Sequence, residues 1–239
     1  MSKVDLMMAV HDRVDFTRET LRCLDENTDW ALVDKFTIFD VASKDVTHDM
    51  LAVCRYPAQV VRFDTRRHIV DVQHEQIKRA TAPLIIKLDN DTIVPPNWLT
   101  EIVGVMDRHP ELDGLGFEAV NTSIGVRIDN MPTTLPRSYA LTQFLGGLHC
   151  FRTRAFAASM PVASGQHFGL QTWMDQRKDL KLGWIAPSLN VFLLDRLPLE
   201  PWATLTRKYV EQGLQRNWEK YSEADAHLWK WWLNKERAS

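Results

Sequence analysis

The sequence predicts an α/β fold in which a mixed, mostly parallel β-sheet carries helices on both faces. Two observations lead to this fold class. In the first half of the chain, apolar runs of strand length alternate with segments whose apolar residues recur at helical spacing. The chain is also long enough for one large domain, because 45% of its 239 residues are hydrophobic and can form a core.

Strands and helices are expected in alternation over residues 3–120. Strands are expected at residues 3–10, 35–41, 58–63, 83–88 and 113–120. Helices are expected at residues 15–27, 43–55, 70–80 and 96–109. Asp15 is a candidate N-cap of the first helix, and Pro96 suits the first turn of the fourth, where its missing N–H has no cost. Such alternation places parallel strands side by side.

The second half of the chain is less regular. A strand with a Gly-Gly turn, a helix and a further strand are expected at residues 131–152, 168–184 and 186–195, respectively. From Trp202 onward the pattern is helical, and this tail holds five of the nine tryptophans. We therefore expect one domain over residues 1–197, followed by a helical, Trp-rich extension over residues 198–239.

Composition excludes several classes of protein. A net charge of −2 argues against binding polyanions over the whole surface, although a local basic face stays open. Cys23, Cys54 and Cys150 are odd in number and far apart, so neither a disulfide framework nor a zinc site is expected. Such cysteine usage is typical of a reducing, cytoplasmic setting. No run approaches the ~20 apolar residues of a transmembrane segment, and the N-terminus lacks a signal-peptide pattern.

Polar residues follow three of the expected strands, in the stretches "AVHDR", "FDVASKD" and "KLDNDT". Ligands bind at the carboxyl ends of strands in such a sheet, so these residues are expected to converge. Asp89 and Asp91 are close enough to repel each other, and a bound Mg²⁺ or Mn²⁺ relieves the repulsion and shares its oxygen ligands with a diphosphate. The alternative is an ordinary turn, in which Asp and Asn side chains bond the backbone.

Four blocks of sequence carry a resemblance to a known family. They are "VDLMMAVHDRVDFTRETLRCL", "FDVASKDVT", "KLDNDTIVPPNWL" and "GGLHCFRTRAF". They occur in the order found in the family 2 glycosyltransferases, which have the GT-A fold, and the resemblance spans residues 3–195. It implies a donor sugar carried on a nucleoside diphosphate such as UDP. It also implies an Mn²⁺ or Mg²⁺ ion that bridges the D-x-D carboxylates and the two phosphates.

The resemblance also implies roles for individual residues. Asp91 would bind the metal directly, and Asp89 would reach it through water or hold the ribose or the sugar. Residues expected to bind the donor are His11, Arg13, Asp40, Ser43, Asp45, Asp89, Asn90, Gly146 and Gly147. Other interpretations stay open: Asp40 and Asp45 could cap the next helix, Arg13 could be a surface side chain, and the two glycines could form an ordinary turn.

The chain departs from the family pattern where the acidic pair that supplies the catalytic base is expected. Gln171 and Thr172 stand there instead. Asp175, one helical turn further on, is the nearest carboxylate, and we nominate it as the base that deprotonates the acceptor hydroxyl. The alternative is that Asp175 is a solvated helix residue. Whether the reaction inverts or retains the anomeric configuration therefore stays open.

A second departure concerns the metal and phosphate ligands. Leu193 stands where many members carry a metal-binding histidine, so Asp195 or water would substitute. His149 and His167 are other candidates, although a single histidine is more often structural. The segment after the third strand is also altered, and three of its residues are candidates for phosphate contact: Arg66, Arg67 and His74.

The acceptor is less well defined by the sequence. The tail interleaves tryptophans with Lys and Arg, and such side chains stack on sugars or bases and contact phosphate. The expected acceptor is a glycan or DNA carrying a hydroxymethylated base; alternatively, the tail packs on the main domain or forms a homo-oligomer interface. The sequence thus predicts a metal-dependent glycosyltransferase. A catalytically inactive module that binds a nucleotide sugar or a glycan is the alternative.

Overall fold

The computed structural model describes most of the first half of the chain and parts of the second. The described residues are 1–53, 57–116, 137–142, 148–159, 179–186, 191–196 and 200–213. Their strands are β1 (Val4–Val10), β2 (Val33–Val41), β3 (Ala58–Phe63), β4 (Leu84–Asp89), β5 (Thr92–Ile93), β6 (Gly114–Gly116), β7 (Ser138–Thr142), β8 (His149–Arg152), β9 (Leu182–Ala186) and β10 (Phe192–Leu193). Their helices are α1 (Val14–Asn27), α2 (Thr47–Ala52), α3 (Ile69–Arg79), α4 (Trp98–Arg108), α5 (Thr153–Ser159) and α7 (Trp202–Glu211), with short 3₁₀ turns η1 (Trp30–Leu32) and η3 (Leu194–Arg196).

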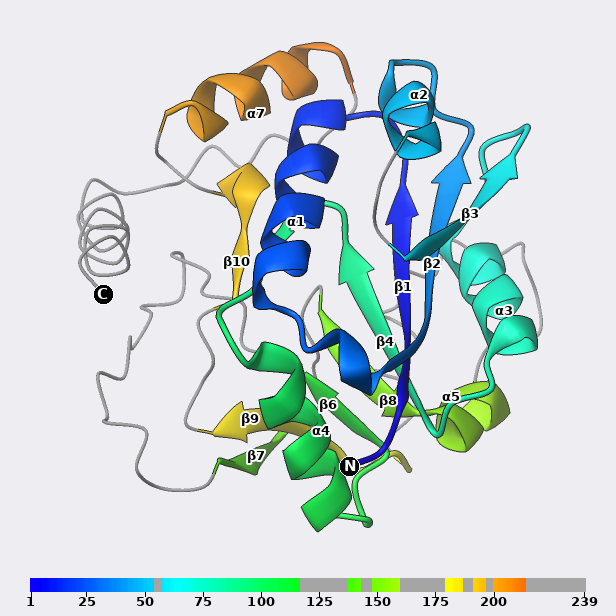
Figure 1. Cartoon of the computed structure of the whole chain (residues 1–239), viewed down its shortest axis with the longest axis vertical. Helices are drawn as coiled ribbons and strands as arrows, with labels where there is room; N and C mark the ends of the chain where they lie inside the picture. The colour runs from blue at the N-terminus through cyan, green and yellow to red at the C-terminus, as the bar shows by residue number, and fades with distance from the viewer. Residues whose placement is uncertain are drawn as a thin grey trace.

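Most of these strands form one eight-stranded sheet in the order β3-β2-β1-β4-β8-β6-β9-β7 (Figure 1). The first four strands in this order are parallel, and β8 runs antiparallel between β4 and β6. β9 pairs parallel with β6 and antiparallel with β7, while β5 and β10 form a separate antiparallel pair. The mixed, mostly parallel α/β fold predicted from the sequence is therefore confirmed.

Both faces of the central strands are buried, and each face has its own helices. Leu6 and Met8 of β1 belong to the larger core, which they share with α1 and with Trp98 of α4. Met7 points to the other face, where it packs in a cluster with Val72 of α3. A strand buried on both faces is apolar at successive positions, and this accounts for the unbroken apolar run of β1.

The register of the parallel strands brings their carboxyl ends to one edge of the sheet. Val10 of β1 pairs with Asp40 of β2, and Ala9 pairs with Asp89 of β4. The segments that follow β1, β2 and β4 therefore lie at the same edge, which is where ligands bind in sheets of this type.

Two elements from the end of the chain also reach this edge. The backbone N–H of Leu194 donates to the carbonyl oxygen of Asp91 over 2.7 Å, which holds η3 beside the end of β4. Helix α7 lies beside the start of α1 (Figure 1), where Phe16 packs against the rings of Trp202 and Tyr209. The beginning of the expected C-terminal extension thus packs against α1.

The second half of the chain differs from the expected elements. The helix expected over residues 168–184 is wrong at its end, because Leu182–Ala186 form β9; residues 168–178 lie outside the described part. Pairing with β6 on one side and β7 on the other outweighs the helical spacing there. The strand expected over 186–195 is shorter, because β10 ends at Leu193 and the chain then turns into η3.

Two helices begin differently from expectation. Asp15 lies in the first turn of α1, and Arg13 occupies the N-cap position with a φ of 60°. Helix α4 begins at Trp98 rather than at Pro96, because the φ of 61° at Asn97 is left-handed and cannot continue a helix. In both cases a left-handed residue other than glycine turns the chain into the helix.

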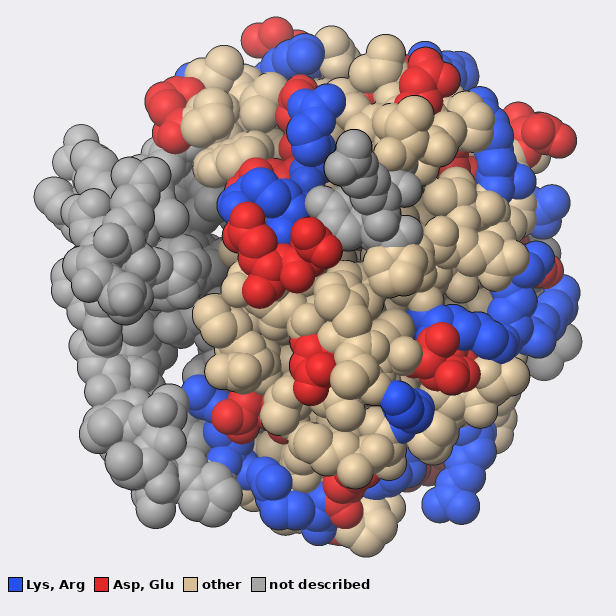
Figure 2. Space-filling view, viewed as in Figure 1, with Lys and Arg blue, Asp and Glu red and all other residues tan. Residues whose placement is uncertain are grey.

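The charged surface shows no dominant sign on the face seen in Figure 2. Lys and Arg side chains lie among Asp and Glu there, and the described residues of this face form no wide patch of one charge. This distribution agrees with the net charge of −2. None of the described helices combines the length and the apolar character that a bilayer span requires.

Candidate active site

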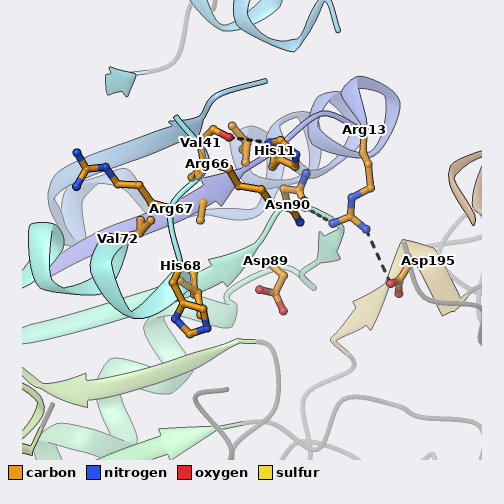
Figure 3. A pocket seen from close by; sticks show the side chains of 13 residues that line it. His11, Arg13, Val41, Arg66, Arg67, His68, Val72, Asp89, Asn90 and Asp195 are labelled. Atoms are coloured by element: carbon orange, nitrogen blue, oxygen red, sulfur yellow. Dashed lines mark hydrogen bonds and ion pairs between the residues drawn. The ribbon is translucent and has the colours of Figure 1, made fainter. Parts of the chain in front are cut away.

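A cavity of about 490 Å³ opens at the carboxyl ends of β1 and β4 (Figure 3). The segment after β1 contributes His11 and Arg13 to its wall, and the end of β4 contributes Asp89 and Asn90. Asp195 of η3 lines the same cavity. The fold therefore brings four residues expected to bind a donor together with a residue expected to help bind a metal.

The opposite wall of the cavity is basic. Arg66, Arg67 and His68, which lead into α3, line it. The Arg67 guanidinium stacks on the ring of Phe63, 4.7 Å from its centroid. In the view of Figure 3, Asp89 lies between this segment and Asp195. Both carboxylates and cations therefore line the cavity.

Arg13 joins the turn after β1 to the D-x-D segment. Its Nη1 donates to Asp91 Oδ2 over 3.2 Å and lies 4.0 Å from Asp195 Oδ2, while its Nη2 donates to Asn90 Oδ1. Asn90 in turn donates to Thr17 Oγ1 over 3.0 Å. The left-handed conformation of Arg13 costs about 1–2 kcal/mol. Because its side chain is only 15% exposed, Arg13 is not the surface residue that was the alternative.

Asp91 lies behind the cavity wall. It is 4% exposed and is not among the residues that line the cavity. Burial raises the pKa of its carboxyl, the Arg13 guanidinium opposes this rise, and the charge of Asp89 adds to it. The two acids of the D-x-D motif therefore have different surroundings: Asp89 faces the cavity and Asp91 is enclosed beside Arg13.

Asp89 has a cation of its own. Lys87 lies two residues earlier on β4, on the same face of the strand, and forms an ion pair with Asp89 Oδ1. Lys87 is buried, whereas 38% of the Asp89 side chain is exposed. Each carboxylate of the motif is thus paired with a basic side chain. In an ordinary turn these side chains would instead accept hydrogen bonds from the nearby backbone, and no basic partner would be needed.

Asp12 locks together the turns after β1 and β2. Its N–H donates to Ser43 Oγ over 2.9 Å, and its Oδ1 accepts from the backbone N–H groups of Lys44 and Asp45 at 2.6 and 3.0 Å. Asp45 accepts from the N–H groups of Val14 at 3.1 Å and of the first residue of α2 at 2.8 Å. Ser43 and Asp45 therefore hold these turns in shape, and Asp45 also accepts from the first backbone N–H of α2, whose N-cap is Val46.

Asp40, which was expected to bond the nucleobase, is fully buried beneath this turn. Its Oδ1 accepts from the N–H of Ser43 at 3.0 Å, and its Oδ2 lies 3.1 Å from His48 Nδ1 and 3.3 Å from Arg62 Nη1. Asp40 is not among the residues that line the cavity. In this structure its carboxylate organises the end of β2.

His11 ties the ends of β1 and β2 together. Its Nδ1 lies 2.7 Å from the carbonyl oxygen of Val41, so Nδ1 carries the proton and donates it. Its Nε2 lies 3.7 Å from Asp12 Oδ2. The ring is therefore held in one orientation at the cavity wall.

A comparison with known families identifies the group to which this arrangement belongs. The sequence matches the family described as Glycosyl transferase family 2 over residues 5–159, a stretch that includes the ends of β1, β2 and β4. The chain belongs to glycosyl transferase family 2. The resemblance to the family 2 glycosyltransferases seen in the sequence is therefore confirmed. None of the curated proteins compared with the sequence is significantly similar to it.

Solved structures share the fold of this family 2 chain. GalNAc-T7 with UDP, GalNAc and Mn²⁺ matches 81% of it with a TM-score of 0.61 and 13% identity. S. aureus TarS 1–349 matches 94% with a TM-score of 0.61 and 14% identity. Mannosyltransferase PcManGT from Pyrobaculum calidifontis, in complex with GDP-Man and Mn²⁺, matches 90% with a TM-score of 0.62 and 12% identity. The family 2 chain covers 43%, 68% and 65% of these three chains, respectively.

Several residues expected in the site of this family 2 chain lie outside its described part. They are Gly146, Gly147, His167, Gln171, Thr172 and Asp175. The nominated base therefore stays a prediction. Among the other candidates, His149 is buried on β8 and packs edge-on against Phe151, and neither His149 nor His74 lines the cavity.

Sequence reasoning missed two residues that hold the site of this family 2 chain. Asp12 carries the signal of a carboxylate that follows a buried strand, between His11 and Arg13. Lys87 interrupts the apolar run "LIIKL". A lysine at a buried strand position is rare unless it is paired, so that interruption was a usable signal.

The cavity of this family 2 chain offers oxygen ligands to a divalent cation. Asp89 and Asp195 both line it, and Mg²⁺ and Mn²⁺ prefer oxygen ligands. In the described part of the chain, no group of three or more His, Cys, Asp or Glu side chains is arranged to hold a metal by itself. An ion here would take its remaining ligands from phosphate or water, as Mg²⁺ commonly does. On these grounds the residues fit such an ion.

Proposed function

We propose that this chain transfers a glycosyl group from a nucleoside-diphosphate sugar to an acceptor hydroxyl, and that the cavity at the ends of β1 and β4 binds the donor. One observation carries the proposal. A single cavity in a family 2 chain is lined by two carboxylates, Asp89 and Asp195, and by a basic segment of Arg66, Arg67 and His68. A diphosphate bound together with a divalent cation has the matching charges.

Asp89 and Asp195 would hold the cation in this proposal. Asp91, expected from the sequence to be a direct ligand, would act from behind through its pairing with Arg13. A bound divalent ion would stabilise the charge that grows on the departing diphosphate. Two of the similar structures contain Mn²⁺, one with UDP and one with GDP-Man, and this supports the choice of ion and donor class.

The residues of this chain would orient the donor as follows. Arg66 and the segment before α3 would bind phosphate oxygens, since guanidinium groups form charge-assisted bonds to them. His11 would line the nucleoside part of the cavity, because Val41 fixes its ring there. Asp40 would support the end of β2 from below, through its bonds to His48 and Arg62.

For the acceptor we propose a carbohydrate hydroxyl, deprotonated by Asp175. DNA with a hydroxymethylated base receives less support, because the face in Figure 2 mixes both signs of charge and a nucleic acid needs a basic face. The division into a catalytic domain at residues 1–197 and an extension at 198–239 stays part of the proposal.

A screen of UDP and GDP sugars for Mn²⁺- or Mg²⁺-dependent thermal stabilisation tests this function. A donor at about 100 times its Kd should add about 2.7 kcal/mol of stability by mass action, a shift of several degrees in Tm. The variant Asp89→Asn should lose the metal-dependent part of the shift, whereas Asp49→Asn, at an exposed position of α2, should keep it. Stabilisation that is equal in wild type and Asp89→Asn would contradict the proposal.

A second readout separates an active transferase from a module that only binds. The wild-type protein should consume the stabilising nucleotide sugar, by slow hydrolysis in the absence of acceptor. Binding of the donor with no consumption, with or without candidate glycans, would favour the inactive module.

A further inference from the structure

Lys87 is a buried charge at the centre of the sheet. It lies on β4 opposite Met7 of β1 and His149 of β8, on the face that α3 and α5 cover. Its neighbours on the same face of β4 are Ile85 and Asp89, and the cluster around Ile85 is apolar. Placing an ammonium group in such surroundings carries a large desolvation penalty, even in a relaxed protein. An apolar side chain would fill this strand position without the penalty.

The geometry links Lys87 to the cavity through one carboxylate. Its Nζ forms an ion pair with Asp89 Oδ1, and Asp89 lines the cavity. Lys87 itself is buried and is not among the residues that line the cavity. The lysine therefore lies beneath Asp89, on the protein side, and holds one oxygen of the carboxylate that faces the ligand space.

The charges of this cluster do not balance. Three carboxylates meet here, from Asp89, Asp91 and Asp195, and they contact two fixed cations, Arg13 and Lys87. With all three acids ionised, these five described side chains sum to a charge of −1. Without Lys87 the same described side chains would sum to −2, which would attract a metal ion more strongly and repel a diphosphate more strongly.

We propose that Lys87 is a positioning residue that acts as a resident cation of the donor site. It holds Asp89 toward the cavity, weakens metal binding by competing for that carboxylate, and strengthens binding of the diphosphate by cancelling one negative charge. The inference rests on the proposed function, because it takes the cavity to be the site of a nucleoside diphosphate. It adds a residue to which the family resemblance gives no role.

This role predicts changes of opposite sign when the charge is removed. Lys87→Met should bind Mn²⁺ about tenfold more tightly and metal-free UDP or GDP about tenfold more weakly, the scale of one unit charge a few ångströms away in a partly buried site. Lys87→Arg should restore both affinities to within about threefold of wild type, since the guanidinium keeps the charge. A lysine that served only to stabilise the sheet would, when removed, weaken both kinds of binding together.

The test measures Mn²⁺ binding by electron paramagnetic resonance, and UDP and GDP binding by calorimetry in EDTA and in Mn²⁺. Lys78→Met is the matched control, because Lys78 pairs with Glu75 on the exposed side of α3 and its loss removes the same charge far from the cavity. Tighter Mn²⁺ binding with weaker metal-free diphosphate binding in Lys87→Met alone supports the inference. Equal affinities in wild type and Lys87→Met, or parallel weakening of both, would overturn it.

Two further results keep the test decisive. If Lys87→Met does not fold, Asp89→Asn serves in its place: loss of the carboxylate that pairs with Lys87 should then strengthen metal-free UDP or GDP binding several-fold, and unchanged or weaker binding would refute the inference. If the wild-type protein binds neither diphosphate in Mn²⁺, the proposed function itself fails. Binding by the wild type without the opposite shifts in the variants refutes only the role of Lys87.

Discussion

At the scale of single residues, the site depends on how buried carboxylates are compensated. Arg13 reaches Asp91, Asn90 and Asp195 from a single left-handed turn. Asp91 is almost fully buried, and burial raises the pKa of its carboxyl, with Arg13 opposing that rise. Arg13 is therefore the main counter-charge that keeps an ionised Asp91 compatible with the fold.

Replacing Arg13 by Met should destabilise the protein by about 3 kcal/mol, because removal of one partner leaves a buried charge without compensation. Urea denaturation at pH 7 measures this loss. Arg18→Met, in the helix that Arg13 precedes, is the control: its pair with Asp15 lies at the surface, so its loss should change stability by no more than about 0.5 kcal/mol. A loss below about 1 kcal/mol in Arg13→Met would show that Asp91 does not depend on this cation.

The sequence identified these residues better than it identified their roles. Asp89, Asn90 and Asp91 stand out because two carboxylates directly follow a buried strand. Which of the two acids faces the cavity could not be predicted, because the answer depends on Arg13, 78 residues earlier than Asp91. Asp40 is expected to bind the nucleobase, and its bonds to His48 and Arg62 within the protein could likewise not be predicted from the motif alone.

At the scale of elements, α7 belongs to the packing around the site. Phe16 of α1 contacts the rings of Trp202 and Tyr209, and the Tyr209 hydroxyl donates to Asp15 Oδ2 over 3.0 Å. Burial raises the pKa of Tyr209, and the bond to Asp15 raises it further. Because α1 also carries Thr17, which supports Asn90, the docking of α7 stabilises the turn that positions the cavity wall.

Tyr209→Phe should lower stability by about 1–2 kcal/mol at pH 8, because the bond to a carboxylate is lost. Because the pKa of Tyr209 is raised in the folded protein, its protonated hydroxyl favours the folded state below the ordinary tyrosine pKa of about 10. This contribution to stability is lost as the pH rises above that value. The difference between wild type and variant should therefore shrink between pH 9 and pH 11. Thermal denaturation across this range measures it, with Tyr139→Phe as a control whose bond to Glu111 is exposed. A difference that stays constant or grows with pH would contradict this role.

The elements that the sequence predicted well are those with local signals. The strands β1 to β4 and the helices between them follow apolar runs and helical spacing. Leu182–Ala186 were expected to be helical in part, and they form a strand because β6 and β7, distant in sequence, pair with both of its edges. Such pairing leaves no trace in a short window of sequence.

At the scale of the whole molecule, the topology explains why charged side chains from distant parts of the chain line the cavity. The parallel strands place Arg13 and Asp89 at one edge of the sheet, and the β5–β10 pair places Asp195 beside them. Arg66 and Arg67 come from the link between β3 and α3. These residues come from four distant parts of the chain. Their convergence could be anticipated from the predicted fold class for the strand ends, but not for Asp195, whose position depends on β10.

The most direct test of the proposed function is the position of manganese in a crystal of the protein grown with Mn²⁺ and the nucleotide sugar that stabilises it most. Anomalous scattering should show one Mn²⁺ ion within coordination distance of Asp89 in the cavity, with the donor diphosphate between the ion and Arg66. A cavity without manganese, or a donor bound elsewhere with Asp89 still paired only with protein groups, would contradict the proposal.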